Sequence, residues 1–183
     1  MPLLICLRSC VAGAAVAALA CGAAAAAGQT AEAGIKAAFL FNFTKFVDWP
    51  VSAPSGPFQI CTVADPAFDA VLARTLNGES TDGRPIVRTT PEGPEFGRAC
   101  HILFISRGES PRVDRWMAAV RGQPVLVVGE SKSAEDGGAH ITFVIEDNRV
   151  KFDVNEDAAS RAGLKISSKL LRVARHVVAR TTQ

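Results

Sequence analysis

Apolar residues recur at three- and four-residue steps between residues 31 and 47, and this spacing predicts an amphipathic helix. The residues expected on its apolar face are Ile35, Ala38, Phe39, Asn42, Phe43, Phe46 and Val47. Trp49 and Pro50 end the element, because proline disfavours helical conformation in the residue before it. Polar residues such as Lys45 and Asp48 interrupt this short run. It is therefore not expected to span a bilayer.

Several short runs rich in β-branched residues predict strands further along the chain. These runs are "PFQICTV" (57–63), "RPIVRTT" (84–90), "HILFIS" (101–106) and "PVLVVG" (124–129). The last two are continuous apolar runs, of the kind that is buried on both faces of a parallel sheet. Helical segments at 68–76 and 112–120 alternate with these strands, and this alternation predicts an α/β sandwich.

The last third of the chain predicts a β-hairpin. Apolar residues alternate with polar ones over 141–145 and again over 150–154, around a tight turn at 146–148. Asn155 is placed to cap a short helix that ends at Gly163. "SSKLLRVARHVVA" then predicts a final amphipathic helix. The expected fold is a three-layer α/β sandwich with a mostly parallel central sheet, a C-terminal β-hairpin and flanking helices.

The first 28 residues are typical of a secretory signal peptide. They contain no acidic residue, an early Arg8, and an alanine-rich run from Val11 to Ala27. Alanine is only weakly apolar, which disfavours a transmembrane anchor. A chain of 183 residues with 48% apolar and 21% charged residues fits one globular domain, here 29–183. We therefore expect export to the periplasm, with lipidation at Cys21 as an alternative to ordinary cleavage.

Export leaves two cysteines outside the leader, Cys61 and Cys100. In an oxidising compartment, an even pair without metal-type spacing favours a disulfide. A pair of buried free thiols is the alternative.

The sequence offers little for catalysis. His101, His140 and His176 have no paired spacing that would hold zinc. "GESKS" (129–133) follows a strand as a nucleophile elbow would, but it lacks the second glycine of that motif. We therefore expect no enzyme, no metal and no cofactor. The formal net charge of +2 indicates no surface for nucleic acid.

Binding sites are expected in two places. Ligands of open parallel sheets collect outside the carboxyl ends of the strands. In this chain, the residues at those ends are Asp65, Arg107, Glu130 and Ser131. A small polar ligand is one hypothesis for them, and plain solvation is the other.

The aromatic helix over 31–47 is the second place. Either its face belongs to the core, or it forms a surface for self-association or a partner. The residues concerned are Phe39, Asn42, Phe43 and, just after the helix, Trp49.

Two separated motifs resemble one known family. "IKAAFLFNFTKFVDWP" (35–50) is similar to the opening signature of the YfiR/HmsC-like proteins, and "NRVKFDVNEDAASRAGLKISSKLLRVA" (148–174) is similar to their closing signature. The similarity covers residues 33 to about 177.

The resemblance implies a small, non-enzymatic periplasmic regulator with an α/β fold. It would bind the periplasmic domain of a membrane diguanylate cyclase, and so hold down cyclic di-GMP synthesis, biofilm formation and exopolysaccharide output. Cys61 and Cys100 fit a disulfide position of the family, whose state is linked to redox control. A further cysteine pair that some members carry near the C-terminal hairpin is missing here. Self-association as a homodimer is a further expectation from the family.

Overall fold

A computed structural model of the protein describes residues 11–92 and 96–178, with side chains from residue 29 onward. The predicted cleavage of the leader and the lipidation of Cys21 concern residues outside the described side chains, and both stay predictions. Where side chains are described, no helix is long and apolar enough to cross a membrane.

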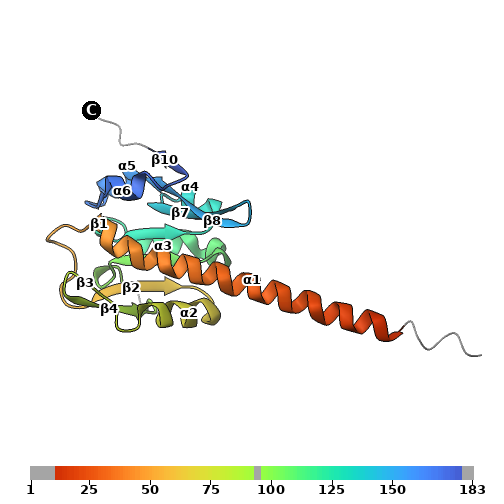
Figure 1. Ribbon diagram of the computed structural model, residues 1–183. Coiled ribbons are helices and arrows are strands. Elements are labelled where there is room, and N and C mark those ends of the chain that lie inside the picture. The colour runs from red at the N-terminus through yellow and green to blue at the C-terminus, as the bar shows by residue number, and fades with distance from the viewer. Residues whose placement is uncertain (1–10, 93–95, 179–183) are drawn as a thin grey trace, which may run out of the picture.

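The described chain forms a mixed sheet flanked by helices (Figure 1). The helices are α1 (Val11–Phe46), α2 (Pro66–Leu76), α3 (Val113–Ala119), α4 (Lys132–Asp136), α5 (Glu156–Arg161) and α6 (Ser168–Leu171), with short 3-10 turns η1 (Phe96–Arg98) and η2 (Arg107–Arg112). The strands are β1 (Val47–Asp48), β2 (Phe58–Val63), β3 (Ser80–Thr81), β4 (Arg84–Thr89), β5 (Ile102–Ile105), β6 (Leu126–Gly129), β7 (Ile141–Glu146), β8 (Arg149–Asn155), β9 (Lys165–Ile166) and β10 (His176–Val178).

The main sheet has the order β10-β8-β7-β6-β5-β2-β4-β3 within the described residues. Strands β4, β2, β5, β6 and β7 pair in parallel, and β7 and β8 form the predicted antiparallel hairpin. Asp147 and Asn148, at the hairpin turn, both have positive φ, as a two-residue type I′ turn requires. A small second sheet pairs β1 with β9. The predicted α/β fold with a mostly parallel sheet is confirmed.

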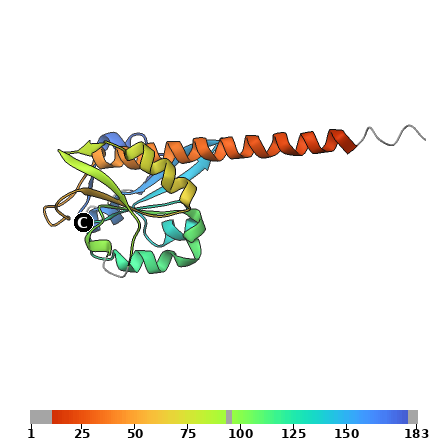
Figure 2. The same cartoon turned by 90° about the horizontal axis from the view of Figure 1, so that it is seen from below.

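Helices cover both faces of the sheet, as Figure 2 shows for α1 and α2 on one side and α3 on the other. One core cluster joins α1 and α2 to the sheet through residues such as Leu40, Phe43 and Leu72. A second cluster packs η1, α3 and α4 on the opposite face, around Leu103 and Val127. The central strands are buried on both faces, which explains their continuous apolar sequences.

The predicted final helix is wrong. Helix α6 stops at Leu171, and the chain then forms β10, which pairs in parallel with β8. The Arg175 guanidinium lies against the Asp153 carboxylate on β8, and the Arg175 N–H donates to the Phe152 carbonyl. The open edge of β8 therefore offers backbone partners to a segment rich in valine, and tertiary pairing overrides the helical periodicity.

The buried face of α1 is also rotated from the predicted one by about one residue. The buried residues of the helix are Lys36, Ala37, Leu40, Phe43 and Thr44. Asn42 is exposed, so it needs no buried hydrogen-bond partner, and Ile35 is 46% exposed. The interpretation of Asn42 as part of the apolar face was wrong, because Leu40 rather than Phe39 occupies the centre of the stripe.

Candidate functional site

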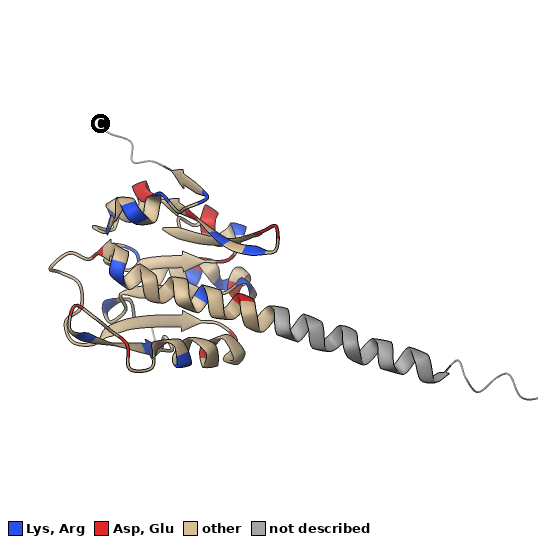
Figure 3. Cartoon of the chain, viewed as in Figure 1, with Lys and Arg blue, Asp and Glu red and all other residues tan. Residues whose placement is uncertain are grey.

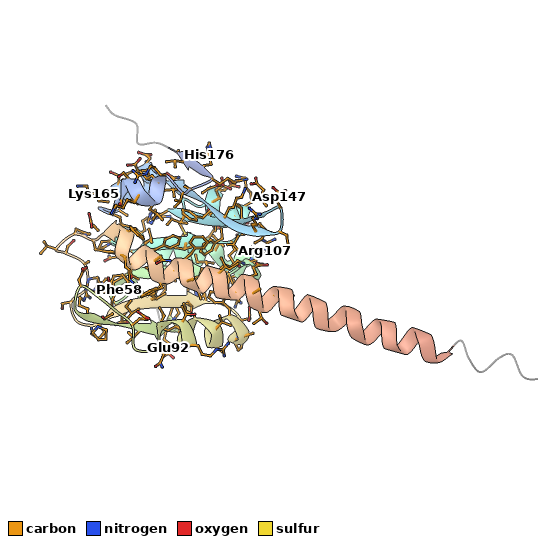
Figure 4. The ribbon with its side chains drawn as sticks, in the orientation of Figure 1. Phe58, Glu92, Arg107, Asp147, Lys165 and His176 are labelled. Carbon is orange, nitrogen blue, oxygen red and sulfur yellow. A yellow bond between two sulfur atoms is a disulfide. The ribbon has the colours of Figure 1, made fainter. Side chains whose placement is uncertain are left out.

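The predicted strand-end residues Asp65, Arg107 and Glu130 lie around one cavity. It has a volume of about 760 Å³ and is bordered on the other side by residues 29–36 of α1 and by α2. The parallel strands β2, β5 and β6 end here, so residues far apart in the sequence meet at one edge of the sheet. Figure 4 places Arg107 at this end of the sheet, beside α1, and Phe58 at the opposite end.

A buried ion pair forms one wall of the cavity. Lys36 Nζ on α1 lies 2.7 Å from Glu130 Oε1, and the two side chains are only 8% and 9% exposed. Lys36 also pairs with Glu32 one turn earlier on the helix. The second oxygen of Glu130 accepts a hydrogen bond from the Arg107 backbone N–H at 3.0 Å. The carboxylate therefore ties α1, β6 and the end of β5 together.

The local backbone explains how Glu130 reaches this position. It follows Gly129, where an added Cβ would lie 2.4 Å from the Ala134 Cβ. Glycine thus allows α4 to pack directly against the end of β6. Ser131, the next residue, does not line the cavity, and its hydroxyl oxygen accepts a hydrogen bond from the Ala134 N–H as the cap of α4.

Of the other charged side chains that line the cavity, one is hydrogen-bonded to another described residue and two are not. Asp65 Oδ1 accepts a hydrogen bond from the Phe68 N–H and caps α2. Arg74, in the last turn of α2, and Arg107 are exposed, and neither guanidinium has a side-chain or backbone partner in the described part of the chain. The three carboxylates of the cavity are therefore engaged, and two of its three cations are not.

The aromatic residues at the end of α1 belong mainly to the core. Phe43 is fully buried, stacks with Phe39 and Phe143 and packs edge-on against Phe152. Trp49 is half-buried, packs edge-on against Phe58 and donates from Nε1 to a backbone carbonyl at 3.2 Å. Of the four residues proposed for a partner surface, Asn42 is the exposed one, Phe39 and Trp49 are half-buried and Phe43 is buried.

Cys61 and Cys100 form the predicted disulfide. Cys61 lies on β2 and Cys100 just before the neighbouring β5, with 5.8 Å between their Cα atoms. Both cysteines are buried, with 1% and 0% of their surfaces exposed. They pack in the core cluster that includes Phe96 and Leu103. The bridge is therefore a buried link between adjacent strands.

The buried histidines have structural roles. His140 Nδ1 accepts from the Val127 N–H at 3.0 Å, and burial lowers the pKa of His140 to about 4, with Arg161 acting in the same direction. His101 Nδ1 accepts from the Gln59 N–H at 3.1 Å, and its Nε2 lies 3.0 Å from the Pro54 carbonyl oxygen and 2.9 Å from Arg84 Nη2. Burial lowers the pKa of His101 as well, with Arg84 as a smaller cause.

Neither of these rings bonds to a carboxylate or a hydroxyl within the described residues. The residues searched, those with described side chains, also contain no cluster of three or more His, Cys, Asp or Glu that could hold a metal ion.

The sequence analysis missed Lys36 and Arg74. A signal for Lys36 was present, because Lys36, Leu40, Phe43 and Val47 follow the steps of one helical face and the last three are apolar. A lysine on such a stripe indicates a buried partner. Arg74 carries no comparable signal, since its place at the cavity depends on how α2 packs against α1.

Comparisons with known proteins identify the fold and the family. The sequence pattern of the YfiR/HmsC-like family matches residues 33–175, which confirms the resemblance of the two motifs. A crystal structure of a conserved domain protein from Vibrio cholerae O1 biovar El Tor superposes with a TM-score of 0.51 at 13% identity, over 65% of this chain and 54% of that one. An ABC domain in complex with L-Trp from Streptococcus pneumoniae gives a TM-score of 0.47 at 9% identity, over 66% and 55%. The chain spans about half the length of both structures.

Proposed function

The chain belongs to the YfiR/HmsC-like family of non-enzymatic periplasmic regulators in cyclic di-GMP signalling, and from this premise we propose that it is a negative regulator of a diguanylate cyclase. In this proposal it binds the periplasmic domain of a membrane-bound cyclase. Binding represses cyclic di-GMP synthesis, and with it biofilm and exopolysaccharide production. The family match over residues 33–175 is the observation that carries the proposal.

We propose that the Cys61–Cys100 disulfide makes this repression sensitive to redox state. The bridge connects neighbouring strands of the sheet, and residues 62–99 between the cysteines include α2, β3 and β4. Reduction would release a covalent constraint on this part of the domain. Because both sulfur-bearing residues are buried, a reductant reaches them only when the structure opens locally.

The contact surface in this proposal uses accessible groups next to the aromatic helix. Asn42 is exposed on α1. Trp49 borders a second cavity of about 760 Å³, together with the fully exposed Val51. Phe43 has no exposed area with which to touch a partner. Acidic and basic residues are interspersed over the face that carries α1 (Figure 3), so we expect mixed polar and apolar contacts.

Deletion of the gene, with cellular cyclic di-GMP measured by mass spectrometry, tests the proposal. We expect cyclic di-GMP to rise and to return to its original level on complementation with the wild-type gene. A gene lacking codons 2–28 should not complement, because its product would stay out of the periplasm. Complementation with Cys61→Ala/Cys100→Ala should restore repression only in part.

Unchanged cyclic di-GMP in the deletion strain, with a membrane cyclase expressed, would contradict the proposed function. Asn42→Arg tests the surface, since it adds bulk without disturbing the core. It should weaken repression, whereas Lys132→Glu on the exposed α4 should not. Equal repression by both variants would show that the contact surface does not include Asn42 on α1.

A further inference from the structure

We propose that the cavity at the strand ends binds a small organic anion, whose carboxylate or phosphate group is held by Arg74 and Arg107. The proposal concerns a ligand and goes beyond the repressor function, which rests on a protein partner. The cavity is lined on its floor and walls by side chains of α1, α2, β5 and the segment after β6.

The cavity lining carries three cations and three carboxylates, so its formal net charge is zero, but the carboxylates are engaged while two arginines stay exposed and accessible to a ligand. Lys36 is neutralised by Glu130 at 2.7 Å and by Glu32. Asp65 is occupied as the cap of α2, 2.9 Å from the Phe68 nitrogen. Arg74 and Arg107 are the cavity's cations without a partner in the described part of the chain. A guanidinium presents a planar fork of N–H donors that matches carboxylate and phosphate oxygens.

The two guanidinium groups come from different elements that border the same opening. Arg74 lies in the last turn of α2, and Arg107 begins η2 directly after β5. Both line the same cavity. The Arg107 backbone is fixed by its N–H bond to Glu130 at 3.0 Å, so the start of this arginine side chain is held in place. An anion held between them would connect α2 to the end of the sheet.

The rest of the cavity indicates that the ligand carries an apolar body. Small and apolar side chains cover its wall between the charged groups, namely Ala33, Ala67, Phe68, Ala70, Val71 and Phe104. The volume of about 760 Å³ lies in the range of roughly 300–1,000 Å³ typical of small-molecule sites. An organic acid or phosphate ester with an aromatic or aliphatic group fits this arrangement better than a bare inorganic ion.

Isothermal titration calorimetry on the protein purified from the periplasm tests the inference. The probes are phenyl phosphate, phenylacetate, the neutral 2-phenylethanol and inorganic phosphate. We expect the two organic anions to bind, the alcohol not to bind, and inorganic phosphate to bind more weakly than phenyl phosphate. Affinity for the anions should fall with added salt, because the contact is ionic.

Substitutions locate the site. Arg74→Ala and Arg107→Ala should each weaken binding of the organic anions by about tenfold, and the double variant should abolish it. Arg172→Ala changes an exposed arginine directly after α6 that does not line the cavity, and this variant should bind like the wild type. The arginines of the cavity are exposed, so unchanged melting temperatures of the unliganded variants should verify that the fold is intact.

Three outcomes overturn the inference: no heat with any anion, equal binding of the alcohol and the anions, or binding that the arginine substitutions leave unchanged. None of them affects the repressor proposal, which is judged by cyclic di-GMP in the deletion strain. Conversely, anion binding that depends on Arg74 and Arg107 supports the inference even if deletion leaves cyclic di-GMP unchanged.

Discussion

The buried Lys36–Glu130 pair yields the sharpest stability prediction. Replacing Lys36 by methionine keeps most of the side-chain volume but removes the ammonium group. Glu130 would then remain only 9% exposed, with the Arg107 N–H as its one remaining direct partner among the described residues. Removing one member of a buried pair typically costs about 3–5 kcal/mol of folding free energy, because the other charge stays desolvated. We expect Lys36→Met to destabilise the protein by about 3 kcal/mol, the lower end, since the cavity gives Glu130 some access to water.

Two further variants separate the contribution of the Lys36–Glu130 interaction from the contributions of the neighbouring groups. Glu130→Gln should cost less than Lys36→Met, because Glu32 still neutralises the lysine and an amide oxygen can accept the Arg107 N–H. The double variant removes both charges and should cost only about 1 kcal/mol, since replacing both members of a buried pair is often nearly neutral. The coupling energy of the cycle should therefore be about 2 kcal/mol or more.

Urea unfolding followed by tryptophan fluorescence measures these differences, with Trp49 and Trp116 as reporters. Lys132→Met is the control, because Lys132 forms its ion pairs on the exposed surface of α4 and should leave the urea midpoint unchanged. Additive losses in the double variant, or a wild-type midpoint for Lys36→Met, would refute the reasoning that the pair is desolvated and coupled.

Three further predictions concern other parts of the core. Cys61→Ala/Cys100→Ala should lower the free energy of unfolding by up to about 4 kcal/mol in urea titrations, because the bridge closes a loop with a separation of 39 residues; equal midpoints with and without it would contradict this. His140 has a folded pKa of about 4 against 6.5 when unfolded, so its contribution is fully present above pH 6.5 and about 3 kcal/mol is lost as the pH falls to 4. The midpoint of His140→Asn, whose amide oxygen can accept the Val127 N–H, should depend less on pH between 6.5 and 4, and an unchanged slope would exclude His140 as the cause. Phe43→Ala should cost about 3–5 kcal/mol by calorimetry, since the ring is fully buried, whereas a loss below 1 kcal/mol would mean that the aromatic cluster collapses into the space.

The elements that the sequence predicted well are those whose own residues decide their structure. Residues 102–105 and 125–128 are continuous apolar runs, a pattern typical of parallel strands that are buried on both faces. The β7–β8 hairpin has alternating apolar residues and a two-residue turn of Asp147 and Asn148, types that accept positive φ. These signals are local, so they are visible without knowing the fold.

The predictions fail where contacts with residues distant in the sequence determine the local structure. Val177 and Val178 fit a helix by spacing, but the unpaired edge of β8 captures them as a strand. The strand-end group was predicted from topology alone, and the structure does place Asp65, Arg107 and Glu130 at one cavity. Its buried ion pair was not predicted, because Lys36 and Glu130 are 94 residues apart in the sequence (130 − 36) and meet only through the fold.

Helix α2 is part of both the disulfide loop and the strand-end cavity. It lies inside the covalent loop closed by Cys61 and Cys100, and it also contributes Phe68, Val71 and Arg74 to the wall of the strand-end cavity. Loosening the loop would thus disturb the part of the cavity wall that α2 forms, and a ligand in the cavity would hold α2 in place. By thermodynamic reciprocity, oxidation and small-anion binding would each favour the other. Helix α2 would in this way respond both to the redox state of the disulfide and to the bound anion.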